Sequence, residues 1–191
     1  MGTPSAGDTR TRLLEAAMSE FIEHGFAGTD TNRIARRAGF APQTFYRWFT
    51  DKKAILTSVL DVWLEAERDT WRAVMNDTTL PTDLLVDACI DNMRPFLTFR
   101  QHLRSVLLND PALNDQHAQS RRQLIIELAG GDSSSERLAM MASLLCQADA
   151  LTEVLARGDI TTMGLSDAPG RADLARLLTQ LRSKHLSPSG Q

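Results

Sequence analysis

The chain has 191 residues, of which 42% are hydrophobic and 24% are charged, and its net charge is −3 at pH 7. These proportions are those of an ordinary soluble globular protein and exclude a fibrous or disordered chain. The length allows one large domain, or a small domain joined to a larger one. The sequence has neither an apolar N-terminal signal nor 18 consecutive apolar residues, so we expect a cytoplasmic protein that does not enter a membrane.

The negative net charge conceals an uneven distribution along the chain. Residues 1–53 hold eight basic and six acidic side chains, whereas residues 54–191 hold thirteen basic and eighteen acidic ones. Between Asp30 and Lys53, six basic residues stand against two acidic ones. Such a local excess of Lys and Arg is what binding to phosphate groups requires.

Three helices are predicted in the first fifty residues. Apolar residues recur at spacings of three and four over residues 9–24, which predicts an amphipathic helix ended by a glycine. A short helix follows over residues 29–39, with Thr29 or Asp30 as its cap and a second glycine at its end. The next helix opens at Ala41-Pro42. A helix, a short glycine turn and another helix form the helix-turn-helix pattern.

The remaining residues predict further helices and no strand. One helix of about 25 residues starts after Thr50 and Asp51, and Pro95 kinks or divides a later helical region. A loop over residues 158–170 separates the last two helices. Helical segments are expected from about residue 51 to residue 75, from Leu84 to Met93, from Leu103 to Leu107, from Pro111 to Leu128, over about 136–157 and over about 171–186. The helix over 136–157 is apolar on two faces, so one face needs a partner outside its own fold. The first eight and last five residues are expected to be loose tails.

The segment GFAGTDTNRIARRAGFAPQTFYRWFTDKKAIL, Gly25 to Leu56, closely resembles the DNA-binding domain of the TetR (tetracycline repressor) family of bacterial regulators. The matching positions are Gly25, Phe26, Thr29, Ile34, Ala35, Ala38, Gly39, Thr44, Tyr46, Phe49, Lys52 and Leu56. Two positions depart from the family pattern: Ala41 stands where a serine often caps the third helix, and Lys53 stands where an acidic residue is common. The resemblance implies an all-α fold, with a helix-turn-helix domain over 1–53 and a helical ligand-binding and dimerisation domain over 54–191.

The third helix is the expected reader of DNA, because a helix in the major groove places its first turns against base edges. Gln43 is the leading candidate for reading a base, since glutamine can pair with an adenine edge, and Thr44 can touch a thymine methyl. Arg47 is expected to reach a guanine or a phosphate. By resemblance to the family, other residues contact the DNA backbone. The full set of expected DNA-binding residues is Thr29, Thr31, Arg33, Pro42, Gln43, Thr44, Tyr46, Arg47 and Lys52.

Large aromatic and sulfur-containing side chains gather on the segments that surround a cavity in this family's second domain. Such residues at helical spacing are also typical of plain core, and both interpretations stay open. The expected ligand-binding residues are Trp63, Trp71, Met75, Met93, Phe96, Phe99 and His102. Asp83, Asp87 and Asp91 form a carboxylate stripe that is typical of a solvated face. Cys89 and Cys146, without C-x-x-C spacing, are expected to be buried free thiols.

Three classes of function were compared: a DNA-binding regulator, an all-helical enzyme and a helical adaptor of proteins. The sequence shows no set of nucleophile, base or metal ligands at catalytic spacing, so we expect no enzyme activity, cofactor or metal. An adaptor has no need of Gln43, Tyr46 and Lys52 at this spacing. We therefore expect a homodimeric regulator that binds double-stranded operator DNA and a small-molecule effector. Repression is the commoner mode in the family, and activation stays open.

Overall fold

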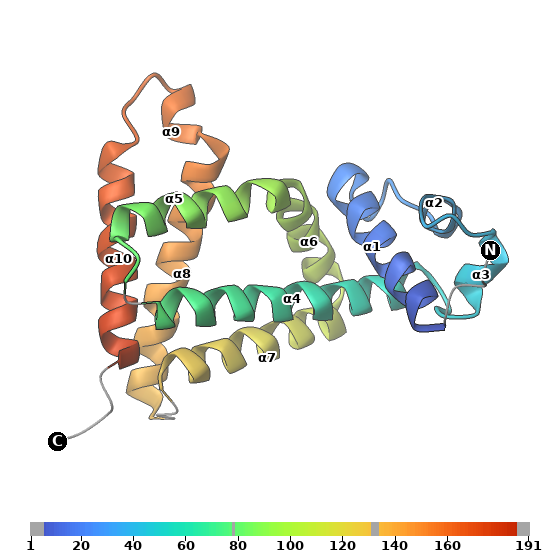
Figure 1. The fold of residues 1–191 in the computed structure, drawn as a ribbon, viewed down its shortest axis with the longest axis horizontal. Helices are drawn as coiled ribbons and strands as arrows, with labels where there is room; N and C mark the ends of the chain where they lie inside the picture. The colour runs from blue at the N-terminus through green and yellow to red at the C-terminus, as the bar shows by residue number, and fades with distance from the viewer. Residues whose placement is uncertain (1–5, 78, 131–133, 187–191) are drawn as a thin grey trace. The chain divides into compact units, whose positions relative to one another are not determined.

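In the computed structural model, residues 6–77, 79–130 and 134–186 are described, and this part of the chain consists of helices joined by turns and loops, with no strand (Figure 1). The all-α fold predicted from the sequence is confirmed. The helices are α1 (Ala6–His24), α2 (Thr31–Arg37), α3 (Pro42–Tyr46), α4 (Lys52–Asn76), α5 (Thr82–Met93), the 3-10 turn η1 (Arg94–Phe96), α6 (Leu97–Asn109), α7 (Pro111–Leu128), α8 (Ser135–Arg157), α9 (Asp159–Thr162) and α10 (Ala168–Leu186).

Side-chain caps start two of the first four helices. The Arg33 backbone N–H donates to the Asp30 carboxylate at 2.8 Å, so Asp30 rather than Thr29 caps α2. The Ala54 N–H donates to Asp51 at 2.8 Å at the start of α4. Ala41 precedes α3 and provides no such bond. This agrees with the sequence, because an alanine side chain has no acceptor with which to cap a helix.

The structure departs from the expected elements at the C-terminal end and in the middle. A short helix, α9, occupies part of the segment expected to be a loop, and the Thr161 and Thr162 hydroxyls both donate to the Gly158 carbonyl there. Pro95 divides α5 from α6 through η1, and α6 is longer than the one or two turns expected. The first helix starts at Ala6, inside the expected loose tail. The rest of that tail, and the last five residues, lie outside the described residues.

The chain forms two compact units, each with its own core. Unit 1 contains residues 1–66 and 98–115, and unit 2 contains residues 67–97 and 116–191. The core of unit 1 joins α1 to α3 with the first part of α4 and with α6. Its largest fully buried side chains are Leu13, Phe21, Ile34, Phe45, Ile55, Leu56, Leu60 and Phe99. The boundary at residue 53 expected from the sequence stays a prediction.

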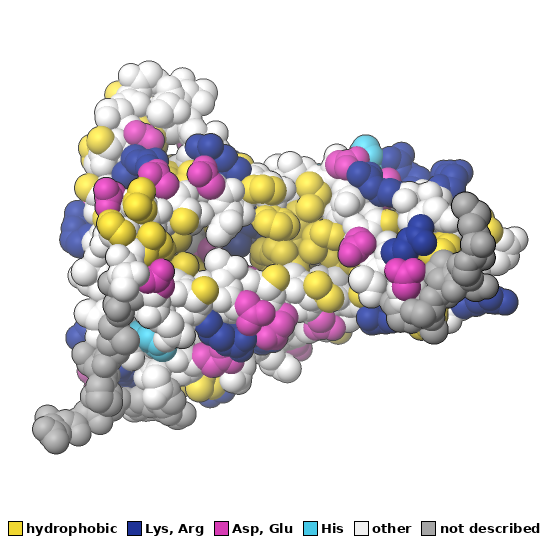
Figure 2. Space-filling view, in the orientation of Figure 1, with side chains coloured by type: hydrophobic (Ala, Val, Ile, Leu, Met, Phe, Trp, Pro, Cys, Tyr) yellow, Lys and Arg dark blue, Asp and Glu magenta, His cyan; other side chains and the backbone are white. Residues whose placement is uncertain are grey.

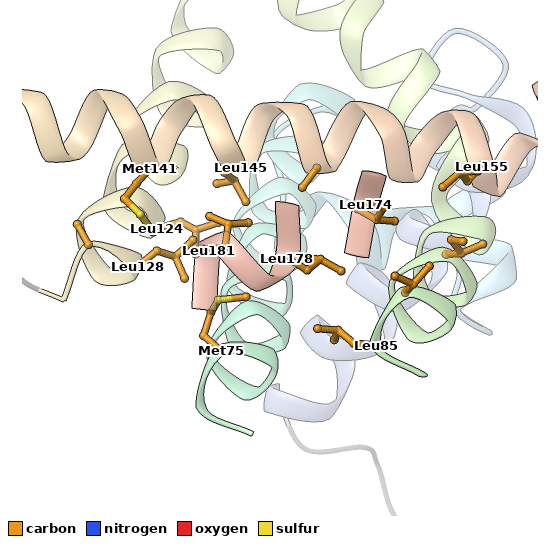
Figure 3. Close-up of a cluster of buried hydrophobic side chains, with 14 residues drawn as sticks. Met75, Leu85, Leu124, Leu128, Met141, Leu145, Leu155, Leu174, Leu178 and Leu181 are labelled. Atoms are coloured by element: carbon orange, nitrogen blue, oxygen red, sulfur yellow. The ribbon is translucent and has the colours of Figure 1, made fainter. Parts of the chain in front are cut away.

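The core of unit 2 lies among α5, α7, α8, α10 and the end of α4. Figure 3 shows Met75, Leu124, Leu145, Leu178 and Leu181 pointing into this cluster. Leu174, Leu178 and Leu181 recur at three and four residues and are fully buried, so one side of α10 is committed to this core. On α8 the buried stripe of Met141, Leu145 and Ala148 packs into the same cluster.

The two cysteines differ in their surroundings. Cys89 on α5 is partly buried, and burial raises the pKa of its thiol to about 11. Cys146 on α8 is exposed, so the expectation that it is buried is wrong. Its neighbours on the same helix face, Ala139, Ser143 and Ala150, are small and exposed as well.

The helix α8 is also long and apolar enough, by composition alone, to cross a membrane. The core helix of a soluble protein has the same properties. Met141, Leu145, Ala148 and Leu155 of α8 are buried in the core of unit 2, and packing accounts for this part of its apolar character, while only 33% of the apolar stretch is buried.

Candidate nucleic-acid interface

The short helix α3 presents polar side chains on one side and is anchored by aromatic side chains on the other. Phe45 and Phe49 are buried, with ring centroids 5.7 Å apart, so they belong to the core. Pro42, Gln43 and Arg47 are exposed, and Thr44 is half-buried.

Within the described residues, the side chains of Gln43 and Arg47 have no hydrogen-bond or ion-pair partner. They are therefore available to an external ligand. This exposure is compatible with the reading role predicted for α3, because direct readout needs unpaired donors and acceptors.

Two hydroxyl groups connect the start of α2 with the end of α3. The hydroxyls of Thr31 and Tyr46 lie 3.0 Å apart, and Tyr46 is 58% exposed although its ring packs edge-on against Phe45. This hydrogen bond fixes the Tyr46 side chain without burying its oxygen. The pair thus presents two neighbouring hydroxyl groups on the outside of the helix-turn-helix.

Two of the three arginines of α2 form hydrogen bonds and ion pairs with glutamates of α1. Arg33 Nε donates to Glu20 at 2.9 Å, and Arg37 donates to the same carboxylate at 3.1 Å and also to Glu23. The Glu20 side chain is only 7% exposed. Burial acts to raise the pKa of Glu20, but the hydrogen bonds from Arg33 and Arg37 outweigh it and hold the pKa below its ordinary value. The structure therefore places Arg33 in an ion-pair network between α1 and α2.

Thr29 and Lys52 likewise have partners within the fold. Thr29 is buried, and its hydroxyl donates to the Glu20 carbonyl at 3.2 Å. Lys52 Nζ donates to the carbonyls of Phe26 at 2.6 Å and Thr29 at 2.8 Å, and it lies 4.2 Å from the Phe26 ring centroid. Burial lowers the pKa of Lys52, while Asp30 acts in the opposite direction. These contacts hold the loop between α1 and α2 against the start of α4.

Arg36 is a basic residue that was not among the expected DNA-binding residues. It is exposed on α2 and, within the described residues, its side chain has no ion-pair or hydrogen-bond partner. Figure 2 shows basic side chains spread over the part of the molecule that carries α1 to α3. The spacing alone does not single it out, because Arg36 lies three residues after Arg33 and therefore on the same side of α2 as Arg33.

Residues 13–59 match the family described as bacterial regulatory proteins, tetR family. The HTH-type transcriptional regulator YdgC of Bacillus subtilis is 24% identical over 138 residues, which are 72% of this chain and 71% of that protein. The HTH-type transcriptional repressor SCO4008 of Streptomyces coelicolor is 40% identical over 53 residues, 28% of each chain. A crystal structure from Mesorhizobium loti, described as a TetR-family regulator, has a TM-score of 0.67 at 17% identity and covers 96% of this chain and 98% of its own.

Residues 13–59 therefore form a helix-turn-helix DNA-binding domain of the tetR family of bacterial regulatory proteins. The fold of the chain as a whole is that of the TetR-family structure from Mesorhizobium loti. The resemblance recognised in the sequence is thereby confirmed.

The residues expected to bind a ligand lie in different units. Trp63 and Phe99 are buried in unit 1 with ring centroids 5.4 Å apart, and the Arg100 guanidinium lies 5.8 Å from the Trp63 ring. His102 is exposed in the same unit, and its ring lies against Gly25.

The other expected ligand-binding residues belong to unit 2. Met75 is fully buried in the core of this unit, and Trp71 packs against that core while half-buried. Met93 and Phe96 are half-buried. Trp71, Met93 and Phe96 thus keep part of their surface accessible, whereas Met75 is enclosed by the protein itself.

Proposed function

We propose that this protein is a homodimeric, cytoplasmic transcription repressor that leaves its operator when a small molecule binds. The observation that carries the DNA-binding part is the contrast on the helix-turn-helix surface. Gln43 of α3 and Arg47, the residue that follows α3, are exposed and unpaired within the described residues, while Arg33 and Arg37 of α2 hold α2 against α1. A rigid scaffold that leaves the polar side chains of one helix free is suited to major-groove readout.

Within this proposal, each residue has a role that its position supports. Gln43 reads a base, with Pro42 and Thr44 beside it in the first turn of α3. Tyr46 and Thr31 offer hydroxyl groups to the DNA backbone, and Arg36 and Arg47 supply positive charge. Thr29, Arg33 and Lys52 support the surface from within, because each has a partner inside unit 1.

The operator-binding proposal is tested by selecting sequences from random double-stranded DNA with the wild type and with Gln43→Ala. We expect a palindrome whose half-sites lie about one helical turn apart, and a Gln43→Ala variant that loses preference at one base position per half-site, with a cost of about 1–3 kcal/mol there. An unchanged sequence preference in the variant would remove Gln43 as the base reader. A protein that selects no sequence at all would contradict operator binding.

The dimer is proposed to form through the exposed faces of α8 and α10. On α8 the exposed positions Ala139, Ser143, Cys146 and Ala150 recur at three and four residues, so they share one face of small side chains. Leu178 of α10 cannot serve in this interface, because it is fully buried in the core of unit 2. Two-fold pairing of these faces would bring four helices together.

A single large charge on this face tests the dimer. We expect Ala150→Arg to give monomers by light scattering, because it buries an unpaired charge at the interface. Ala118→Arg, on the exposed side of α7 in the same unit, is the matched control and should leave the mass unchanged. A dimer that survives Ala150→Arg at micromolar concentration places the interface elsewhere.

An effector is proposed to bind in the helical body, where Trp71, Met93 and Phe96 keep accessible surface. The 25-residue helix α4 contributes residues to both units, so a ligand that displaces α4 can act on unit 1. Because the coupling between two ligands is reciprocal, such an effector weakens operator binding by the factor by which operator weakens effector binding. The test is a thermal-shift screen, followed by operator titrations with each hit in the wild type and in Trp71→Ala. Unaltered operator affinity at saturating ligand would contradict this proposal, and tighter operator binding would indicate an activator.

A further inference from the structure

Unit 1 contains a pocket that none of the roles above uses. Its volume is about 330 Å³, and it lies between the turn that ends α1 and one side of α6. The residues lining it are Phe26, Ala27, His102, Ser105, Val106, Asn109 and Asp110. His102 was expected to belong to a cavity of the second domain, and the structure places it here instead.

Two adjacent lysines at the start of α4 hold the two walls of this pocket. Lys52 donates to the Phe26 carbonyl at 2.6 Å and so fixes the wall formed by the α1–α2 loop. Lys53 Nζ lies 2.6 Å from the Asp110 carboxylate and so fixes the wall at the corner between α6 and α7. The width of the pocket is therefore connected to the first two residues of α4.

The lining combines hydrogen-bonding side chains, one of them a carboxylate, with apolar surface. Asp110 is the only carboxylate among the lining residues, and its hydrogen bond with Lys53 holds its pKa below the ordinary value, so it is ionised at neutral pH. The Asn109 amide N–H donates to the Ser105 carbonyl at 2.7 Å, which leaves the amide oxygen available. Phe26, Ala27 and Val106 supply the apolar surface.

This combination suits a flat, apolar ring that carries a cationic N–H donor. A planar amidinium can donate two parallel hydrogen bonds to one carboxylate, as a guanidinium does. A neutral ring of the same shape lacks the charge and gains only the apolar contacts.

We propose that this pocket is a binding site for small aromatic cations, with the cationic group on Asp110 and the ring against Phe26 and Val106. The bound cation competes with Lys53 for Asp110 and presses on the loop that leads to Asp30, the cap of α2. Occupancy therefore loosens the positioning of α2 and α3 and lowers operator affinity. This last step rests on the proposed operator binding, whereas the binding site itself does not.

Binding is tested on the full chain, without DNA, with benzamidine as the probe and benzamide as its neutral counterpart. Calorimetry or NMR titration should show that benzamidine binds more tightly than benzamide. Asp110→Asn should weaken benzamidine binding about tenfold, the size of one lost charge-assisted hydrogen bond, while Asn keeps the ability to cap α7. Lys53→Gln should strengthen it several-fold, because it frees the carboxylate.

The opposite effects of Asp110→Asn and Lys53→Gln distinguish this site from unspecific binding. Equal affinities in the wild type and Asp110→Asn would overturn the site, as would a failure of benzamidine to perturb NMR signals of Phe26 and Val106. Circular dichroism of both variants confirms that they are folded before binding is interpreted.

The regulatory step is tested by titrating operator with and without saturating benzamidine. We expect operator affinity to fall about 5-fold or more in the wild type, a coupling typical of effectors, and to stay unchanged in Asp110→Asn. If benzamidine binds at Asp110 but leaves operator affinity unaltered, the regulatory step is wrong. If the wild type selects no operator, the proposed function fails. The benzamidine titrations without DNA still test whether the binding site at Asp110 exists.

Discussion

The two short helices of the helix-turn-helix, α2 and α3, use their polar residues in opposite ways. On α2 a side-chain cap from Asp30 and the two ion pairs to Glu20 hold the helix in place. On α3 the cap is missing, and Gln43 and Arg47 have no partner within the described residues. Two helices with similar surface chemistry thus differ in pairing: Arg33 and Arg37 of α2 are held by ion pairs, whereas the polar side chains of α3 stay available for the reading role proposed above. Burial and pairing, rather than residue type, distinguish them.

The largest expected effect comes from removing the carboxylate that holds α2. Glu20→Ala leaves the partly buried guanidinium groups of Arg33 and Arg37 without their shared partner, which should lower the free energy of unfolding by about 2 kcal/mol. Urea denaturation followed by circular dichroism measures this. Glu23→Ala is the control, because Glu23 is 45% exposed and its loss should destabilise the protein less than the loss of Glu20. Equal costs for the two variants would show that Glu20 has no special supporting role.

The same carboxylate predicts a loss of stability in acid. Because the folded state holds the pKa of Glu20 below its ordinary value of 4.5, its contribution is complete above that pH and is lost as the pH falls through the lower folded value. The difference in unfolding free energy between the wild type and Glu20→Gln should therefore narrow as the pH falls below 4.5. A difference that stays constant down to about pH 3 would contradict the ion-pair explanation.

The caps of the two helices should respond in opposite directions. Asp30→Ala removes the bond to the Arg33 N–H and should cost about 1 kcal/mol of stability. Ala41→Ser should add about 0.5–1 kcal/mol, because the backbone at residue 41 is already in the extended conformation that a cap adopts. Thermal or urea denaturation measures both. If Ala41→Ser gives no gain, the start of α3 is satisfied by other means and the contrast with α2 is weaker.

The smallest effect is expected for Arg47, the exposed arginine that follows α3. Arg47→Gln should reduce the slope of log affinity against log salt by about 0.9 if Arg47 contacts a phosphate, and should leave the slope nearly unchanged but relax one base position if it reads a guanine. Operator titrations at several salt concentrations decide between these roles. Arg122→Gln, an exposed residue of α7, is the control that should change neither quantity. No effect of Arg47→Gln on slope, affinity or preference would exclude it from the interface.

The sequence predicts the fold well where local signals decide the structure. The caps at Asp30 and Asp51, the glycines after α1 and α2, and the proline at the start of α3 set helix boundaries through backbone chemistry that is local. The short helix α9 was missed because the Gly158 turn and the following threonines are also typical of a loop. Four residues are too few to show a helical period.

Site residues are harder to predict, because exposure and pairing depend on contacts between distant segments. The sequence shows that Arg33 is basic and near the reading helix, but not that Glu20, thirteen positions earlier, accepts its hydrogen bond. It shows Thr29 at a family position without showing that its side chain is buried. His102 likewise lies by a pocket next to the helix-turn-helix, because the fold of α6 brings it to Gly25.

The unequal surroundings of the two cysteines have a practical consequence. With its pKa raised to about 11, the Cys89 thiol stays protonated at neutral pH and is a poor nucleophile, whereas Cys146 is exposed. A thiol-reactive spin label should therefore attach to Cys146 in the unmodified protein, with Cys146→Ser as the unlabelled reference. Since Cys146 lies on the small-residue face of α8 that is proposed to form the dimer, dimerisation should shield it, and the rate of labelling would report whether this face is covered. The native chain thus carries its own single-site reporter, without any need to engineer one.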